Sequence, residues 1–241
     1  MLTKAQVKYI QSLGHKKLRD SEDVFVAEGP KLLHELLNAG NVKPVAIYAT
    51  DAFAEKHPHL KNLVRIREQE LERISSLSSP NEVLGIFSKP VFDQPSYASS
   101  ISLMLDGIQD PGNLGTIIRT ADWFGVRNII CSRDCADSFN SKVVQSTMGS
   151  LTRVQLVYTD LPQFIVDTRL PALYAATLHG KDLHQLTAVR EGIFIIGNES
   201  RGISEALLSA ATHRITIPRK GQAESLNAGV AAGIILAYLS Q

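Results

Sequence analysis

The sequence predicts an α/β protein in two parts, a small α/β domain followed by a larger domain built on a parallel β-sheet. Short apolar segments alternate with helical patterns along the 241 residues, as expected for βα units. In the second half these segments are continuous rather than alternating, which is typical of strands covered on both faces. SKPVFDQPSYASS (88–100), with two prolines and four serines, indicates a linker. We therefore expect domains over 1–90 and 101–241, joined by residues 91–100.

In the first part, one helix has recognisable ends. Residues 30–40 (PKLLHELLNAG) are predicted to be helical, because Pro30 stands at the start and Gly40 just past the end, where each residue is favoured. The short apolar segments around this helix are predicted strands: VFVAEG (24–29), PVAIYAT (44–50), NLVRIR (62–67) and EVLGIF (82–87).

In the second part, the alternation of strands and helices is more regular. The predicted strands are SLMLD (102–106), NIICS (128–132), VQLVYT (154–159), PALYAAT (171–177), GIFIIGN (192–198) and RITIP (214–218). The clearest helices are LGTIIRTADWFG (114–125) and SLNAGVAAGIILAYL (225–239), and the second of these is rich in small residues and ends the chain.

Composition restricts the class of protein. The apolar fraction is 44% and the charged fraction 20%, which is ordinary for a soluble globular protein. No segment approaches the roughly 18 apolar residues of a membrane span, and the N-terminus lacks the apolar stretch of a signal peptide. We expect a cytoplasmic protein without a membrane partner. The net charge of +1 neither supports nor excludes nucleic acid.

Cysteines and histidines give no indication of a metal. Cys131 and Cys135 are too few for a disulfide framework. A cluster-binding cysteine motif would need a third cysteine at position 138, where the chain has Ser138. The seven histidines show none of the spacings typical of zinc sites, so no metal is expected.

Three segments follow predicted strands of the second domain, where ligands bind in open parallel sheets. In LDGIQDPGNLGTIIRTADWFG (105–125), a loop with glycine and proline leads into a helix whose first N–H groups can hold an anion. FIIGNESRGIS (194–204) passes from a strand directly into Gly-Asn-Glu-Ser-Arg-Gly. In ITIPRKGQAESLNAGVAAG (215–233), the small residues from 228 to 233 indicate close packing of the last helix.

Each segment alone also has a purely structural explanation. Asn113 is a candidate helix cap and Arg119 an ordinary surface residue. Glu199 has a second interpretation, in which it only neutralises Arg201, and Ser225 is a candidate cap of the last helix. A dinucleotide-binding turn is excluded by spacing, since the glycines at 107, 112 and 115 do not form G-x-G-x-x-G.

Together the three segments resemble the three motifs of the SpoU (TrmH) family of RNA ribose methyltransferases, in the SPOUT superfamily. Order, spacing and strand context agree over residues 101–239, and FVAEGPKLLHELL resembles the substrate-binding domain that precedes the catalytic domain in many members. The matching residues are Asp106, Pro111, Asn113, Gly115, Arg119, Thr120, Ala121 and Gly125 in the first motif, Gly197, Asn198, Glu199 and Gly202 in the second, and Ile217, Pro218, Ser225, Leu226 and Asn227 in the third.

The resemblance implies a fold that composition does not show. Family members thread the C-terminal segment through a loop to form a deep trefoil knot, and they dimerise through the knotted region. The small residues at 228–233 are compatible with such packing. Two positions depart from the family pattern: Arg219 stands where methionine is frequent, and Ala228-Gly229 stands where Val-Ser is frequent. These departures leave the subfamily and the target nucleotide open.

The resemblance also implies a cofactor, S-adenosylmethionine, and a reaction, methyl transfer to a ribose 2′-hydroxyl. Residues expected to line the cofactor pocket are Leu178, His179, Gly180, Gly197, Ile217 and Leu226. Arg119 is the family's candidate for deprotonating the hydroxyl, yet a guanidinium is effectively always protonated. Our hypothesis is that Arg119 binds the adjacent phosphate and stabilises alkoxide charge. Asn113 is expected to orient Arg119 or the ribose.

Further expectations concern the supporting residues and the RNA. Glu199, Ser225 and Asn227 are expected to form a hydrogen-bond network. Two basic clusters are expected to contact the RNA backbone, although such clusters are often only solvated surfaces: Lys16, Lys17 and Arg19 beside His15, and the pair Arg219 and Lys220.

The target is not fixed by the sequence. The two-domain layout favours ribosomal RNA over transfer RNA. The alternatives are a transfer-RNA 2′-O-methyltransferase, a base methyltransferase of the same superfamily, and a non-catalytic RNA-binding or ribosome-assembly relative. An oxidoreductase that uses a dinucleotide is the most remote of them.

Overall fold

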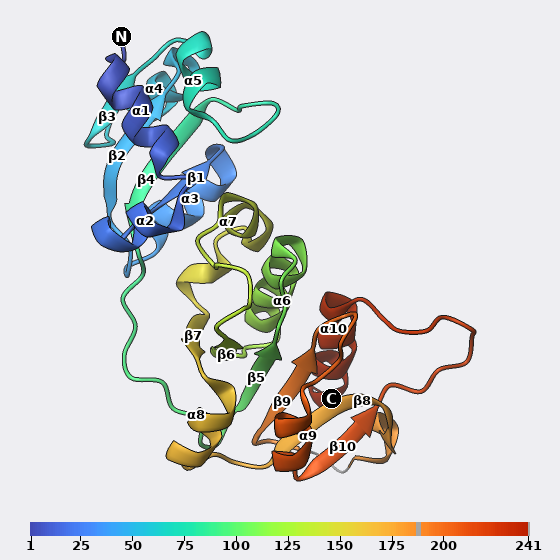
Figure 1. Cartoon of the computed structure of the whole chain (residues 1–241). Coiled ribbons are helices and arrows are strands. Elements are labelled where there is room, and N and C mark those ends of the chain that lie inside the picture. Colours follow the sequence, from blue (N-terminus) through green and yellow to red (C-terminus); the bar gives the residue numbers. More distant parts are fainter. Residues whose placement is uncertain (187–188, 241) are drawn as a thin grey trace. The chain divides into compact units, whose positions relative to one another are not determined.

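Two sheets organise the chain, each in its own compact unit of the computed structural model, which describes residues 1–186 and 189–240 (Figure 1). The first unit comprises residues 1–92 and 139–152, and the second comprises residues 93–138 and 153–241. The segment 139–152 therefore packs with the first unit, whereas the division expected from sequence assigned it to the second domain. Within residues 1–186 and 189–240, no helix has the length and apolar character needed to cross a membrane.

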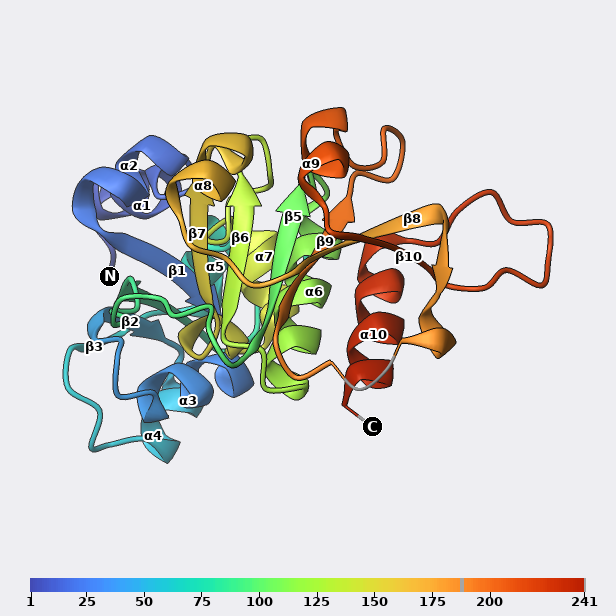
Figure 2. The same cartoon turned by 90° about the horizontal axis from the view of Figure 1, so that it is seen from below.

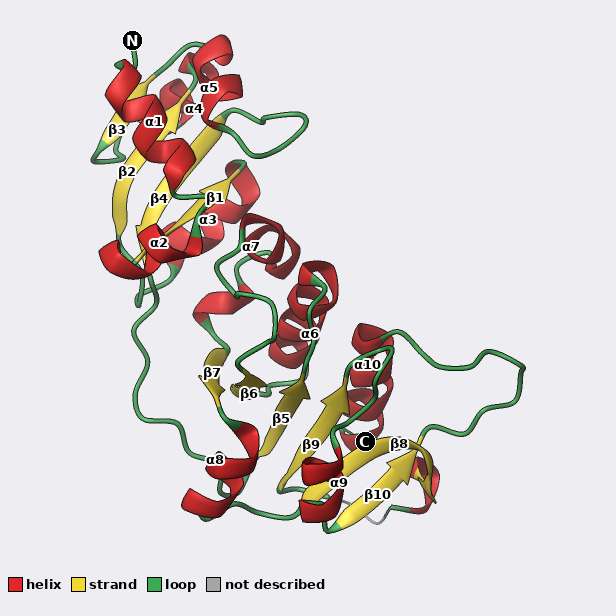
Figure 3. Ribbon diagram, in the orientation of Figure 1, coloured by secondary structure: helices red, strands yellow, loops and turns green. Residues whose placement is uncertain are grey.

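The first unit is a four-stranded sheet between two layers of helices. Its strands lie in the order β1-β4-β2-β3, with β4 antiparallel to β1 and β2. Figure 3 shows the alternation of its helices and strands. The elements are α1 (Lys4–Ser12), α2 (Lys16–Glu22), β1 (Val24–Glu28), α3 (Pro30–Asn38), β2 (Pro44–Ala49), α4 (Asp51–Lys56), β3 (Leu63–Arg65), α5 (Glu68–Ile74), β4 (Val83–Ser88), α7 (Ser141–Thr147) and the 3-10 turn η1 (Ser150–Thr152).

Alternation along the strands explains why this sheet is covered on both faces. Phe25 and Ile47 belong to one apolar cluster, with Leu33 of α3 and Val144 of α7. Their strand neighbours Val24 and Tyr48 belong to a second cluster with α1 and α5. Successive strand side chains point to opposite faces, so each strand contributes to both cores.

The second unit is built on a parallel sheet, as the sequence predicted. Among its described residues, six strands lie in the order β10-β8-β9-β5-β6-β7, and every pairing is parallel. The elements are β5 (Ile101–Asp106), α6 (Pro111–Trp123), β6 (Asn128–Ser132), β7 (Gln155–Thr159), α8 (Leu161–Asp167), β8 (Leu173–Asp182), the 3-10 turn η2 (Leu183–Gln185), β9 (Gly192–Gly197), α9 (Glu205–Ala210), β10 (His213–Thr216) and α10 (Ala228–Leu239).

Helices cover this sheet as well. Met104 of β5 and Ile195 of β9 pack with Leu161 of α8 and Leu207 of α9. Helices α6 and α10 lie side by side, because a Cβ added at Gly229 of α10 would meet the side chain of Thr116 of α6 at 3.0 Å (Figure 2). The small residues of the last helix therefore serve close helix packing, as the sequence indicated.

The helix ends differ from the sequence-based expectation at two caps. Helix α6 begins at Pro111 and is capped by Asp110, whose carboxylate accepts the Asn113 backbone N–H at 2.8 Å, so Asn113 is not the cap. Helix α10 begins at Ala228 and is capped by Asn227, so Ser225 is not its cap. In both places the residue directly before the first helical residue accepts the free N–H groups with its side chain. Hydrophobic periodicity alone does not identify that residue.

Candidate active site

The candidate site lies where the strand order of the second unit reverses. From β5 the chain continues to β6 and β7 on one side, while β9 and then β8 lie on the other. Asp106 and Gly197, the last residues of β5 and β9, are register partners, so two of the three motif loops leave the sheet side by side. A crevice at such a reversal is the general ligand site of open α/β sheets.

Hydrogen bonds hold these two loops together. The Asn198 side-chain amide donates to the Gly107 carbonyl at 2.7 Å. The Asp106 carboxylate accepts the Ser204 backbone N–H at 2.7 Å. The residues that the sequence singled out in the first two motifs therefore meet in space.

The 197–202 turn needs glycine at two positions. Asn198 and Gly202 form an isolated bridge, and the Asn198 side chain accepts the N–H groups of Ser200 and Arg201. Gly202 has a φ of +69°, which favours glycine. A Cβ at Gly197 would lie 2.5 Å from the Gly202 oxygen, so the turn closes only because position 197 has no side chain.

An amide relay connects all three motifs. The Asn113 side-chain amide donates to the Glu199 carboxylate. The Asn113 side-chain oxygen in turn accepts the Asn227 amide at 2.8 Å. The Asn227 oxygen caps α10 by accepting the N–H of Gly229 at 3.0 Å. Glu199, Asn113 and Asn227, far apart in sequence, thus form one connected group where the three motif segments meet.

Arg119 lies on α6 beyond this relay and is exposed to solvent. It follows Asn113 by six residues, or nearly two helical turns. The structure thus gives the relay an exposed cation on the same helix.

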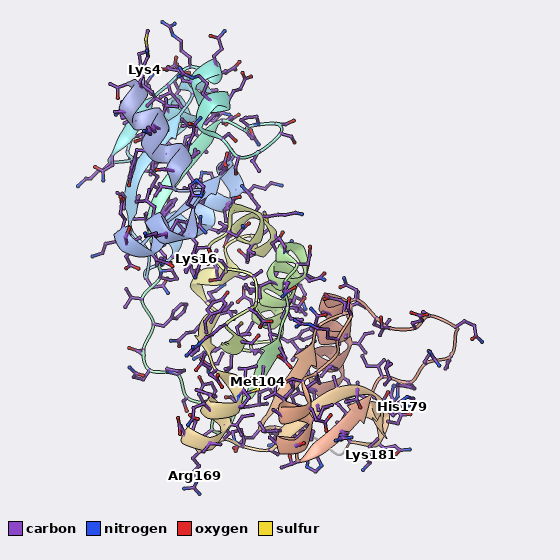
Figure 4. All side chains as sticks on the ribbon, viewed as in Figure 1. Lys4, Lys16, Met104, Arg169, His179 and Lys181 are labelled. Carbon is purple, nitrogen blue, oxygen red and sulfur yellow. The ribbon has the colours of Figure 1, made fainter. Side chains whose placement is uncertain are left out.

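The expected cofactor segments meet only in part. Strand β8 pairs with β10 on either side of a bulge, so that Ala175 faces Arg214 while Lys181 faces Ile215. The intervening residues 176–180 include Leu178, His179 and Gly180, and all three are exposed. Figure 4 shows His179 and Lys181 on this strand. The expected loop after PALYAAT is therefore a bulge within a strand.

Backbone contacts tie this bulge to the start of the third motif. The Leu178 carbonyl accepts the Thr216 hydroxyl at 3.3 Å. A Cβ at Gly180 would lie 2.7 Å from the Arg214 backbone carbon. Ile217, directly after β10, therefore follows the residues that contact Leu178 and Gly180.

Ser225 and Leu226 are placed differently from the other predicted residues. After β10 the chain leaves the sheet and returns only at α10, and both residues lie on this exposed excursion (Figure 1). Arg219 and Lys220 lie on it too, and the Arg219 guanidinium donates to the Ala223 carbonyl at 3.1 Å. Since Asn227 anchors the end of the excursion at Asn113, only its last residue is fixed to the relay.

Of the first basic cluster, two residues lie on the surface and one does not. Lys16 and Lys17 are exposed on α2. Arg19 is buried, and its guanidinium donates to the carbonyls of Leu13 and Gly14 at 2.7 and 2.8 Å. These bonds satisfy carbonyls at the C-terminal end of α1, which is a structural task and not the predicted RNA contact.

Sequence reasoning missed a group of residues at the end of β6 and just after it. Ser132 accepts the Gly107 N–H at 2.8 Å, and the Cys135 sulfur accepts the Ile108 N–H at 3.2 Å. Asp134 forms an ion pair with Arg201 at 3.2 Å. Arg201 therefore has an acidic partner other than Glu199, which is the residue that the alternative interpretation assigned to it. Because β6 neighbours β5, residues after β6 reach the same edge of the sheet, and this adjacency is the signal that could have identified them.

The environment of Cys135 makes it an unusual thiol. A hydrogen bond from Cys131, supported by Ser132 and backbone N–H groups, lowers the pKa of Cys135 to about 7. Burial raises the pKa of Cys131. Since Cys135 is buried, this pKa concerns its charge and not its access to reagents, and we expect its thiolate to be half-formed at about pH 7.

The difference in thiolate ultraviolet absorbance between the unaltered protein and the Cys135→Ser variant, followed across a pH series, checks this expectation. Cys131, in the Cys135→Ser variant, is expected to stay protonated. A difference in absorbance that first appears at the pH of an ordinary free thiol would contradict the assignment.

Asn227 caps α10 and also donates to Asn113, and the contribution of the cap can be measured as a change in stability. Serine also caps helices, whereas alanine does not, so Asn227→Ala is expected to lower the free energy of unfolding by about 1 kcal/mol. Asn227→Ser is expected to change that free energy much less. Urea denaturation of both variants measures the difference, and equal losses would show that the cap is not what stabilises α10.

Two family models match this chain, one in each of the two parts that the sequence predicts. Residues 100–237 match the SpoU rRNA Methylase family, and residues 4–85 match the MRM3-like substrate binding domain. The chain belongs to the SpoU rRNA methylase family. The resemblance seen in the three motifs is thereby confirmed.

Two relatives align along nearly the whole chain. The chain is 29% identical over 238 residues to the 23S rRNA (guanosine(2553)-2'-O)-methyltransferase RlmP of Bacillus subtilis, covering 97% of this chain and 95% of that protein. It is 28% identical over 245 residues to the 23S rRNA (uridine(2479)-2'-O)-methyltransferase of Streptomyces viridochromogenes, covering 93% of this chain and 85% of that protein.

Solved structures agree with the fold. The AdoMet-bound rRNA methyltransferase from Sinorhizobium meliloti superposes with a TM-score of 0.86 at 30% identity, covering 99% of this chain and 95% of that one. The SpoU methyltransferase AviRb from Streptomyces viridochromogenes, in complex with AdoMet, gives a TM-score of 0.87 at 24% identity, covering 99% and 97%. The second likeness shows the fold alone.

Proposed function

We propose that this protein transfers a methyl group from S-adenosylmethionine to a ribose 2′-hydroxyl of ribosomal RNA. The observation that carries the proposal is the relay of Glu199, Asn113 and Asn227, which connects the three family motifs at the strand-order reversal. Both aligned relatives are named as 23S rRNA 2′-O-methyltransferases, and they share the two-part layout over most of their length.

The chemistry of the motif segments fits S-adenosylmethionine, a cofactor without phosphate that neutral backbone groups and apolar side chains can hold. At positions 180 and 197, neighbouring backbone occupies the space that a Cβ would fill, so glycine there keeps these two segments tightly closed and presents only backbone groups. Gly180, Gly197 and Ile217 would hold the adenosine part through neutral backbone groups, with Leu178 against it. His179, Ser225 and Leu226 would join this lining from the exposed segments. The sulfonium supplies the electrophilic methyl group when bound.

Arg119 would act on the RNA rather than as a base. A guanidinium is a poor base and a good phosphate ligand, so Arg119 would bind the phosphate beside the target ribose and stabilise the alkoxide charge that develops on the 2′-oxygen. Asn113 would orient the ribose, since its amide is fixed at both ends by Glu199 and Asn227. Fixed dipoles of this kind cost no reorganisation during the reaction.

Basic side chains of both units would contact the RNA backbone. Lys16 and Lys17 are exposed in the first unit, and Arg219 and Lys220 in the second. Phosphate contacts make affinity fall steeply with salt. Filter-binding at several salt concentrations tests this role, because the Lys16→Gln, Lys17→Gln double variant should show a shallower dependence than the unaltered protein.

We further propose a homodimer through the helices α6 and α10, within a knotted catalytic unit. Trp123 at the end of α6 is 83% exposed, and Val230 and Ile234 on α10 are 50% and 38% exposed. Apolar side chains clustered on packed helices are typical of protein interfaces. A second copy would bury them.

Trp123 provides the test of this interface, because it is the one tryptophan in the sequence. Its emission is expected to shift to the blue as protein concentration rises through the dimerisation range, in step with the mass measured by light scattering. Ile234→Asp should abolish both changes. A monomer at all concentrations would exclude the interface.

The catalytic proposal is tested by methylating ribosomal RNA from cells that lack this protein. Radiolabelled S-adenosylmethionine, followed by digestion to nucleosides, is expected to give a 2′-O-methylated nucleoside. A methylated base would indicate the base-methyltransferase alternative, and labelling of transfer RNA alone would change the substrate. Absence of cofactor binding by calorimetry would point to a non-catalytic relative.

A further inference from the structure

A cavity of about 170 Å³ lies within the first unit, and its lining includes no residue of the three motifs. Its walls come from α1, β1, the end of α5 and the segment around α7. This volume is below the roughly 300–1,000 Å³ of sites that enclose drug-sized ligands, so the cavity suits one small ring system. The apolar part of its lining is Ile10, Leu13, Val26, Ile74 and Phe139.

Polar groups converge on the same cavity. Glu28 is buried, and its carboxylate accepts the Ser75 hydroxyl, the Ser76 hydroxyl at 2.7 Å and the Ser76 N–H at 2.9 Å. A carboxylate has about four acceptor positions, so one position remains for an N–H group of a ligand. Ser141 adds a hydroxyl to the lining.

The cavity is built on a fixed frame. The Gln11 side chain donates to the Arg73 carbonyl at 2.7 Å, which joins α1 to the end of α5. Arg19 holds the carbonyls of Leu13 and Gly14, which also line the cavity. Such prior ordering of the walls reduces the entropy that binding must overcome.

Basic side chains lie in the cavity lining and close to it in sequence, beside the Glu28 carboxylate, and Lys16 among them also pairs with Asp20 at 3.5 Å. Arg73 lines it and is exposed, and Lys16 and Lys17 follow Gly14 by two and three residues. Lys16 projects from this unit in Figure 4. A ligand with a planar ring, N–H donors and a flanking negative charge matches the apolar wall, the Glu28 acceptor and these cations together.

We propose that this cavity binds one unpaired nucleobase of the RNA substrate, with its N–H edge toward Glu28 and its flanking phosphates near Arg73 and the α2 lysines. Proteins that read RNA sequence commonly take splayed bases against aromatic side chains and hydrogen-bond their edges, and Phe139 and Glu28 supply those two contacts. The inference rests on the proposed function in one respect, which is that the base comes from RNA.

The segment 139–152 gives this site a further property. Phe139 and Ser141, from the part of the sequence that matches the methylase family, line a cavity whose other walls match the substrate-binding domain. The base-binding cavity is thus completed by the catalytic half of the sequence, so that neither half alone forms it.

Nuclear magnetic resonance of the full ¹⁵N-labelled chain tests the proposal with the four nucleoside 5′-monophosphates as probes. At least one is expected to cause saturable shifts of the Gly14 and Ser76 amides, with a dissociation constant on the order of 1 mM. Ser141→Phe, which fills the cavity, should weaken this binding at least tenfold. Ser146→Phe, the same change on α7 outside the lining, should not.

Each outcome is decisive. Lack of saturable shifts at Gly14 and Ser76 with all four probes, or equal binding by Ser141→Phe, overturns the proposal. Should Ser141→Phe fail to fold, Val26→Phe fills the cavity from β1 instead. Shifts confined to the second unit report only the adenosine site. Cofactor binding and methylation by the unaltered protein are measured separately. If both fail while the shifts at Gly14 and Ser76 are present, the proposed function is wrong and the cavity still binds a nucleotide.

Discussion

Arg119→Lys is expected to lower the rate of methyl transfer by roughly 10²–10³-fold at saturating cofactor, the usual cost of losing a group that stabilises transition-state charge. Lysine keeps the charge but loses the planar fork that holds a phosphate in two bonds. Cofactor affinity should be unchanged, because the residues proposed to hold S-adenosylmethionine lie on other elements of the unit. Single-turnover methylation and calorimetry measure the two quantities.

Arg169→Lys is the matched control, since Arg169 is also exposed in the second unit but lies before β8 (Figure 4). It should retain full activity. Near-normal turnover by Arg119→Lys would remove Arg119 from the mechanism, and loss of cofactor binding would assign it a role in the cofactor pocket.

Gly197→Ala is expected to abolish S-adenosylmethionine binding and to destabilise the fold. The added Cβ would lie 2.5 Å from the Gly202 oxygen and from the Ile203 nitrogen, both backbone atoms that side-chain rotation does not relieve. Overpacking in a well-packed region costs about 1–3 kcal/mol, and here the turn that carries Asn198 and Glu199 has to open. Thermal melting and calorimetry are the measurements.

Gly221→Ala is the control for that change, because a Cβ at position 221 meets nothing within 4 Å. Its melting temperature and cofactor affinity should equal those of the unaltered protein. Unimpaired cofactor binding by a folded Gly197→Ala variant would show that the second-motif turn is not part of the pocket.

The local pattern of residue types in the sequence was enough to predict the parallel sheet and three residues of the candidate site. Continuous apolar segments identified a parallel sheet, and the structure has one. Asn113, Glu199 and Asn227 were selected by sequence position alone, and they form one hydrogen-bonded group. This succeeds because strand ends of a parallel sheet share one edge, so the residues that follow them are brought together.

Other features depended on side-chain environment, which periodicity does not describe. Arg19 was expected at the RNA, yet its guanidinium lies buried on the carbonyls of Leu13 and Gly14. Asp110, not Asn113, caps α6, and Asp134, not Glu199, pairs with Arg201. In each case the partner is chosen by distance after folding, among several residues of suitable chemistry.

The sequence by itself determined the strands, the motif residues and the family, because these depend on residue types at fixed spacing. Only the tertiary structure decided that residues 139–152 pack with the first unit, and that Ser132 and Cys135 support the loop after β5. Such pairings join residues distant in the chain. They follow from how strands are ordered in a sheet, an order that local hydrophobic pattern leaves undetermined.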